Sequence, residues 1–148
     1  MTIHELQRAA LVLFAAREAI DTNSMQTLKA ICLVIRNRVK AGWHDANWLT
    51  IIEHADNVAG NMPRAAPKLD LNSKALQLLC RDIDSIYHGT AQDELQDAIG
   101  DPKDKKTRPA LYYHFIDRPI NPWFHEHIIN DRKNHPVRAR VHPIVFFE

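Results

Sequence analysis

Glu18 is the residue whose type and position best suit acid–base chemistry. It follows an entirely apolar run, ALVLFAA, at residues 10–16. On a helical wheel its side chain lies beside Leu11 and Phe14 rather than beside the charged side chains. An apolar wall disfavours the charged carboxylate, and the carboxyl end of a helix presents partial negative charge, so both effects favour the protonated acid. A carboxylic acid that stays protonated near neutral pH can serve as a general acid.

A structural role for Glu18 is the competing interpretation. A glutamate near a helix end often pairs with a basic side chain or stays half exposed. Arg17 in the same helix and Arg36 or Arg38 in the next helix are available partners. Asn37 and Arg38 are themselves interpreted as structural, because an amide near a buried helix end can tie two segments together.

A second group of chemically useful side chains is aromatic. Tyr112, Tyr113 and His114 fall in a stretch of strand composition. On a strand, Tyr112 and His114 face one side and Tyr113 faces the other. Phenolic hydroxyls can stabilise developing charge, and aromatic rings can stack on sugar faces. The rings of Trp123 and Phe124 offer a further surface on which a sugar can stack. The alternative is that the tyrosines lie in the core and that Trp123 and Phe124 make a contact between the core and a lid.

The elements that must position these residues are predicted to be mainly helices. Because residues 10–16 are apolar on every side, the first helix is expected to lie at the centre of the domain. Residues 55–70 contain a glycine and two prolines and predict a loop. Apolar periodicity and capping residues predict helices at 3–20, 25–41 and 72–87, a shorter one at 47–54, and a short surface helix or turn at 91–100.

The last third of the chain changes in composition. Residues 110–115 have strand composition, and 123–130 predict a short helix or an extended piece. Residues 137–148 predict one or two strands, which Pro143 should restrict to an edge or a bulge. The pattern indicates one α+β domain over residues 1–148, mainly helical, with a small β element in its C-terminal third.

Composition excludes several classes of protein. The chain has 148 residues, of which 45% are hydrophobic and 25% charged, as in an ordinary folded domain. Nineteen basic residues against eighteen acidic ones give a formal net charge of +1. A nucleic-acid-binding protein normally has a large basic excess, so we expect no nucleic-acid partner. Basic residues and five of the nine histidines concentrate after residue 100, which makes this third the candidate for contact with an anionic or polar surface.

Cysteine content and apolar runs bear on the compartment. Cys32 and Cys80 lie in apolar helical patterns and are expected to be buried free thiols. No stretch approaches the roughly 18 apolar residues of a membrane span. Glu5 precedes the first apolar run and no basic segment does. We therefore expect synthesis in the cytoplasm without a signal peptide and without an integral membrane segment.

The histidines were considered as metal ligands. His125 and His127 are two residues apart, whereas zinc ligands on a helix prefer a spacing of four. We therefore expect no metal and no other cofactor. A zinc site that also uses His114, His135 and His142, as in an amidase or endopeptidase, remains an alternative.

Five motifs in order resemble one known family. The stretch EAIDTNSMQTLKAICLVIRNRV at residues 18–39 resembles the start of the SleB/CwlJ-type cell wall hydrolase domain. In that domain a glutamate–alanine pair after an apolar helix precedes a polar turn and a helix ending in V-I-x-N-R-V. The C-terminal end matches again through DP at 101–102 and ALYYHF at 110–115, then through PWF at 122–124 and HPIVFFE at 142–148.

The resemblance implies a lysozyme-like domain that cleaves peptidoglycan between N-acetylmuramic acid and N-acetylglucosamine. It implies that Glu18 is the catalytic acid and that Tyr113, or failing that Tyr112, lines the cleft. His114 and Trp123 are the further substrate-binding candidates. The chain departs from the family pattern before and after the glutamate, where Arg17 replaces a glycine and Ile20-Asp21-Thr22 replace R-G-E. The family's middle glutamine–phenylalanine–serine motif is not visible.

A single acid favours lytic transglycosylation over hydrolysis. In that reaction the sugar's own C6 hydroxyl attacks C1 and closes a 1,6-anhydro ring. A hydrolase needs a second carboxyl group, about 5–5.5 Å away for retention or about 6.5–9.5 Å away for inversion. No sequence feature besides residue type supports the candidates for it, which are Asp21, Asp45, Glu53, Asp56 and Asp117.

The expected partner is therefore the peptidoglycan glycan strand, bound by a monomer that acts on the cell wall. Delivery by a phage or prophage lysis system fits a wall enzyme made without an export signal. A relative that keeps the fold and grips peptidoglycan or a protein without turnover is the alternative from another functional class.

Overall fold

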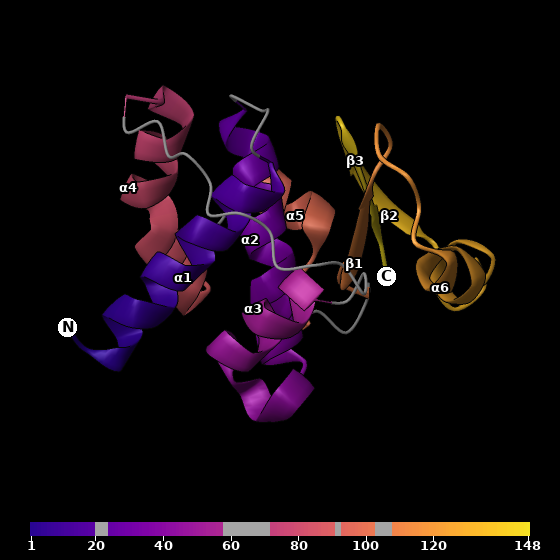
Figure 1. Cartoon of the computed structure of the whole chain (residues 1–148), viewed down its shortest axis with the longest axis horizontal. Helices are drawn as coiled ribbons and strands as arrows, with labels where there is room; N and C mark the ends of the chain where they lie inside the picture. Colours follow the sequence, from indigo (N-terminus) through magenta and orange to yellow (C-terminus); the bar gives the residue numbers. More distant parts are fainter. Residues whose placement is uncertain (20–23, 58–71, 91–92, 103–107) are drawn as a thin grey trace.

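The chain forms a group of helices followed by a small sheet (Figure 1). The computed structural model describes residues 1–19, 24–57, 72–90, 93–102 and 108–148. Over these residues it is mainly helical, with a three-stranded antiparallel sheet near the C-terminus, which confirms the mainly helical α+β class. The elements are α1 (Ile3–Glu18), α2 (Met25–Lys40), η1 (Trp43–Ala46), α3 (Trp48–Asn57), α4 (Lys74–His88), α5 (Glu94–Ile99), β1 (Tyr112–Phe115), α6 (Pro122–Phe124), η2 (His125–Ile129), β2 (Val137–Val141) and β3 (Ile144–Phe147).

Local signals set most helix boundaries. Ser24 caps α2, its hydroxyl accepting from the backbone N–H of Thr27. Gly89 ends α4 in the left-handed conformation, at φ 72°. The α3 helix extends beyond its predicted end into the expected loop, because Ala55 packs against the core. The rest of that loop, residues 58–71, lies outside the described residues.

The central helix is α2. Every residue from 27 to 37 is buried, because α2 contacts α1, α3, α4 and α5 as well as β1 and β2. The expectation that the first helix occupies the centre was wrong. The α1 helix buries Leu11, Phe14 and Glu18 on one side, but Leu13 on the other side is 44% exposed.

Two expectations about apolar helical segments have different outcomes. Cys32 is a buried free thiol, and burial raises its pKa. Cys80 is a free thiol but exposed, because α4 turns Leu79 and Ile86 into the core instead.

Among the described helices, none is both long and apolar enough to cross a membrane.

The sheet has the strand order β1-β3-β2, and both neighbouring pairs are antiparallel. Its inner face, toward the helices, carries Tyr113, Phe115 and Phe146, which belong to the main core. Its outer face carries Tyr112 and Phe147, which pack in a second, smaller cluster. The alternation along β1 thus sends neighbouring tyrosines to opposite faces.

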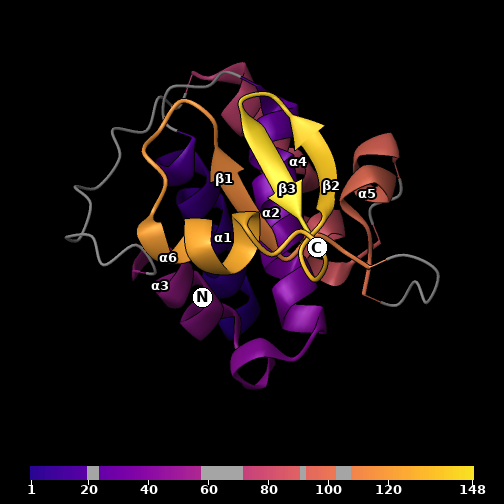
Figure 2. The ribbon, with the colours of Figure 1, turned by 90° about the vertical axis from the view of Figure 1, so that its right-hand side faces the viewer.

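A second layer covers the outer face of the sheet. The α6 and η2 segment lies on the side of the sheet away from the helices (Figures 1 and 2). Ile128 and Phe124 from this segment pack against Val145 and Phe147 of β3. Because both faces of β3 are covered, all four of its residues are buried.

Residues 137–148 form two strands, and β2 is an edge strand with an irregular register between Val137 and Ala139. The prediction that Pro143 causes the edge or bulge was wrong. Pro143 lies in the two-residue turn between β2 and β3, outside both strands. In that position it removes no hydrogen bond from the sheet, so β3 can be the central strand. The turn also contacts other elements, since the Pro143 carbonyl accepts from Ile116 N–H and the His142 carbonyl accepts from the Thr27 hydroxyl.

Buried polar side chains at the end of α2 tie the helices to the C-terminal third. The amide of Asn37, fully buried, donates to the carbonyls of Gly100 at 3.0 Å and Ala110 at 3.1 Å. Its oxygen accepts from Arg36, whose other terminal nitrogen donates to Gln96. The expectation that Asn37 ties two segments together is therefore confirmed.

Replacing Asn37 with alanine should lower the free energy of unfolding by about 3 kcal/mol, since two buried carbonyls and one arginine N–H lose their partner. Chemical denaturation followed by circular dichroism measures the change. The control is Asn130→Ala, at an exposed position, which should shift the free energy by less than about 0.5 kcal/mol. Equal stability of the two variants would contradict the proposed role of the Asn37 hydrogen bonds in joining α2 to the C-terminal third.

Candidate functional site

Glu18 is the last residue of α1 and points to the inside of the molecule. It is 5% exposed and shares the buried side of the helix with Leu11, Phe14 and Ala15, as the helical wheel predicted. Among the described residues it is the one acidic side chain that is buried. A carboxyl group in such a place must be satisfied by specific partners.

The first partner of Glu18 is Tyr113, on the inner face of β1. Its hydroxyl donates to Oε2 of Glu18 at 3.1 Å. The tyrosine ring is held between Phe115 and Phe146, each with ring centroids 6.2 Å away. The alternation of the strand thus places a phenol against the acid at the end of α1.

Arg38 is the nearby cation. Its Nε donates to the Leu111 carbonyl at 2.7 Å, and its guanidinium lies 5.1 Å from the ring centre of Trp43 and 5.9 Å from that of Tyr113. Burial lowers the pKa of Arg38, and electrostatic interactions with Tyr113, Tyr112 and Glu18 oppose part of that shift. The guanidinium therefore interacts electrostatically with Glu18 as well as with the aromatic rings.

Arg118 fixes the backbone at Glu18. Its Nη2 donates to the Glu18 carbonyl at 2.7 Å, and its guanidinium carbon lies 3.8 Å above the Phe115 ring centre. A cation at a helix C-terminus also complements the partial negative charge there. The loop after β1 is thereby joined to the end of α1. We call Glu18, Arg38, Trp43, Tyr113 and Arg118 the Glu18 cluster.

A strained turn delivers Trp43 to this cluster. Gly42 has φ 83°, and three further residues in succession have positive φ: His44 at 46°, Asp45 at 57° and Ala46 at 59°. Residues other than glycine adopt positive φ only at a cost in free energy, so such a turn persists only where contacts with its surroundings stabilise it. Contacts on both sides do so here. The His44 ring stacks on His54 at 4.1 Å, and Asn47 N–H bonds the His44 carbonyl.

Sequence reasoning missed two members of the Glu18 cluster, Trp43 and Arg118, which were not singled out. Arg38 was named as one of three possible partners of Glu18 and interpreted as structural. The available signals are faint: Trp43 follows a glycine that ends a helix, and Arg118 follows a predicted strand by three residues. Neither spacing indicates that Trp43 packs on Arg38 or that Arg118 bonds the Glu18 backbone carbonyl.

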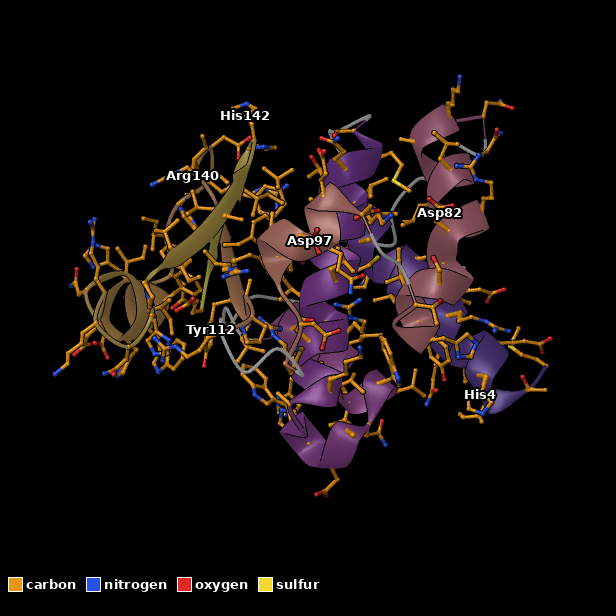
Figure 3. The ribbon with its side chains drawn as sticks, turned by 180° about the vertical axis from the view of Figure 1, so that it is seen from behind. His4, Asp82, Asp97, Tyr112, Arg140 and His142 are labelled. Carbon is orange, nitrogen blue, oxygen red and sulfur yellow. The ribbon has the colours of Figure 1, made fainter. Side chains whose placement is uncertain are left out.

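The other predicted substrate-binding residues lie away from Glu18. His114 belongs to the outer face of β1, with its ring 6.0 Å from that of Phe124. Trp123 lies on α6, beyond the outer face, and is 49% exposed. Tyr112 lies on the outer face of β1, at the end of the sheet far from His142 (Figure 3). Its ring centre is 5.5 Å from that of Trp43, so it borders the Glu18 cluster from outside.

The described residues contain no group of three or more His, Cys, Asp or Glu side chains that could hold a metal ion. Two of the histidines considered as zinc ligands, His127 and His135, are bonded to backbone carbonyls instead. His135 donates through Nδ1 to the Glu148 carbonyl, and His127 donates through Nδ1 to the Trp123 carbonyl. His142 lies at the tip of the β2–β3 hairpin (Figure 3).

The candidates for a second catalytic carboxyl group are at the surface where they are described. Asp45, Glu53 and Asp117 are exposed, and Asp117 acts electrostatically on His114. Asp21 and the Asp56 side chain lie outside the described residues. The described part of the chain thus brings one carboxyl group, not two, into the buried cluster.

Comparisons with protein-family models, with curated proteins and with solved structures find no match to this chain. The resemblance to cell wall hydrolases therefore depends on the motifs quoted above. Any function has to be argued from the geometry of the side chains.

His114 makes folding sensitive to acid. Burial lowers the pKa of His114 below its ordinary value of 6.5, and Asp117 opposes the shift. The unfolded chain therefore takes up this proton first, and the stability that the neutral imidazole contributes is lost as pH falls below about 6.5. NMR titration of His114 should give a midpoint below 6.5, and His114→Gln should flatten the fall in unfolding free energy between pH 7 and 5. An unchanged slope, equal to that of the exposed control His125→Gln, would contradict this.

Proposed function

We propose that the chain is a lysozyme-like domain that cleaves peptidoglycan glycan strands between N-acetylmuramic acid and N-acetylglucosamine by lytic transglycosylation. Glu18 is the catalytic acid in this proposal. The monomeric domain acts on the cell wall without metal or cofactor, and delivery from the cytoplasm by a phage or prophage system would bring it there.

The observation that carries the proposal is the position of Glu18. It ends an apolar helix, is 5% exposed, and accepts a 3.1 Å hydrogen bond from the phenol of Tyr113. An acid of this kind is held in one orientation and kept from bulk water, which are the conditions for transferring a proton to a bound oxygen. The motif resemblance names the same glutamate independently of its surroundings.

The proposed reaction uses Glu18 twice. Its carboxyl group first donates a proton to the glycosidic oxygen, and the bond from that oxygen to C1 of the muramoyl residue breaks through an oxocarbenium-like state. The Glu18 carboxylate then takes the proton from the C6 hydroxyl, whose oxygen bonds to C1. The products are a 1,6-anhydromuramoyl end and a free N-acetylglucosamine hydroxyl, and Glu18 is protonated again.

Neighbouring groups support both halves of this cycle. When Glu18 has given up its proton, the Tyr113 hydroxyl and the Arg38 charge stabilise the carboxylate. Arg118 holds the helix end so that the carboxyl group does not move between the two proton transfers. These three residues would therefore be positioning groups around one acid.

Transglycosylation is favoured over hydrolysis because it needs no second carboxyl group. Asp45, Glu53 and Asp117 are exposed, and Asp117 acts on His114 of the outer face. A retaining or inverting hydrolase would need one of them, or a residue beyond those described, facing the same bond.

One observation favours the non-catalytic alternative. At 5% exposure Glu18 offers little surface to a glycan, and its interactions with Tyr113 and Arg38 also suit a buried structural acid. In that alternative the fold grips peptidoglycan or a protein without cutting. The catalytic and the non-catalytic function predict different results when Glu18 is replaced by its neutral isostere, glutamine.

Replacing Glu18 with glutamine should abolish clearing of purified peptidoglycan in a zymogram, with a loss of about 10²–10⁴-fold in rate, since the amide cannot donate the proton. The matched control is Glu53→Gln, at an exposed position, which should clear like the native chain. Mass spectrometry of the digest should show 1,6-anhydromuropeptides. New reducing ends in their place would indicate hydrolysis, and equal clearing by both variants, or none by the native chain, would remove Glu18 from catalysis.

The two tyrosines provide a second, internal comparison. Tyr113→Phe removes the hydroxyl that bonds Glu18 and should lower kcat by about tenfold, with little change in KM. Tyr112→Phe removes a hydroxyl on the other face of the strand and should leave kcat within about twofold. Rates on soluble glycan fragments measure both, and the reverse ranking would place the cleft on the outer face of the sheet.

A further inference from the structure

An exposed tryptophan stands out on the outer layer of the molecule. Trp123 is 49% exposed, whereas Trp48 is 8% exposed. It lies on α6, which covers the outer face of the sheet, while Glu18 lies on the helical side (Figure 1). Trp123 therefore belongs to a surface separate from the Glu18 cluster.

The indole is held rigidly despite its exposure. Asn121 Oδ1 accepts from the backbone N–H of Trp123 at 2.8 Å and of Phe124 at 3.4 Å, and Pro122 begins the helix. His127 stacks nearly parallel on the indole, with ring centroids 4.8 Å apart and planes at 17°, and donates through Nδ1 to the Trp123 carbonyl at 2.9 Å. One face of the indole is therefore backed by an imidazole. Because the ring is already held in place, the Trp123 side chain would lose little conformational entropy when a ligand stacks on it.

The exposed residues that follow Trp123 in its segment are polar. The apolar side chains of the same segment turn toward the sheet, Ile128 being 2% exposed and Phe124 packing on Phe147. The exposed residues after Trp123 include His125, Glu126 and His127; two are imidazoles and one is a carboxylate. A protein or membrane contact would call for a broad apolar area, which these polar residues do not offer.

We propose that Trp123, backed by His127, is a second carbohydrate-binding site that takes the apolar C–H face of a pyranose in the glycan strand. A pyranose presents an apolar face and a rim of hydroxyls, which matches an exposed flat ring backed by the His127 imidazole on a segment whose other exposed side chains are polar. The glycan as ligand rests on the proposed function. The site holds the polymer by stacking, on the side of the sheet away from the acid, and it takes no part in bond cleavage.

Two sites on one domain would raise retention on a polymer without changing chemistry on a short substrate. A glycan strand held at Trp123 raises the local concentration of strands near the domain. A fragment of two or three sugars engages one site at a time. The effect of Trp123 should therefore appear with insoluble peptidoglycan and vanish with short fragments.

The test compares Glu18→Gln with the double variant Glu18→Gln/Trp123→Ala in sedimentation with purified peptidoglycan, so that cleavage does not remove the ligand. The double variant should bind about tenfold more weakly. A third protein, Glu18→Gln/Ile120→Ala, removes an apolar side chain that is 39% exposed in the loop just before α6 and should bind like Glu18→Gln. Circular dichroism checks that all three proteins fold.

Titration with chitotriose, the soluble trimer of N-acetylglucosamine, tests the site directly through tryptophan fluorescence. The change in emission should be lost with Trp123→Ala in the otherwise native chain, while turnover of short soluble fragments stays within about twofold of native. Equal sedimentation with and without Trp123 would overturn the inference. So would a loss of binding to phosphatidylglycerol vesicles, or of self-association, in place of a loss of glycan binding.

The outcomes also separate this inference from the proposed function. If the native chain fails to cut peptidoglycan but Trp123→Ala still reduces sedimentation, the proposed function falls and the carbohydrate site stands. If the native chain cuts and Glu18→Gln does not, while Trp123→Ala changes nothing, the carbohydrate site falls and the proposed function stands.

Discussion

Three consecutive polar residues at the end of α2 must find partners because the helix that carries them is surrounded. Arg36, Asn37 and Arg38 cannot reach bulk water freely, and a buried donor without an acceptor costs more than a typical hydrogen bond contributes. Their partners are the side chain of Gln96 and the carbonyls of Gly100, Ala110 and Leu111. That requirement brings Gly100 and residues 110–111 against α2 and so fixes where β1 begins.

The Glu18 cluster follows from this placement of β1. Once Leu111 accepts from Arg38, the next inward position of the strand is Tyr113, and its ring lies against the guanidinium. The phenol then reaches Glu18, and Arg118 returns from the far end of β1 to the Glu18 carbonyl. The structural hydrogen bond from Arg38 to Leu111 and the candidate catalytic contact from Tyr113 to Glu18 therefore depend on the same placement of β1.

The sheet divides the molecule into two chemically different sides. On its inner face a buried acid, an arginine and aromatic rings form a tight cluster in which protonation is controlled by burial and nearby charge. On its outer face a short helical layer buries Phe124 and Ile128 and leaves Trp123 in solvent. Neighbouring residues of β1, Tyr112 and Tyr113, belong to opposite sides because side chains alternate along a strand.

The sequence by itself determined the helices, their caps, the mainly helical α+β class and the inward side of Glu18, because apolar periodicity and capping are local properties. It also indicated Asn37 as a tie, since an amide in an apolar helix needs partners. It did not determine which helix is central: α1 is the more apolar run, but α2 is the helix that seven elements contact. Nor could it choose Arg38 among the possible partners of Glu18, bring Trp43 and Arg118 into the Glu18 cluster, or separate His114 and Trp123 from it. Those distances depend on how strands and helices pack, and packing joins residues that are far apart in the chain, such as Glu18 and Arg118, 100 positions apart.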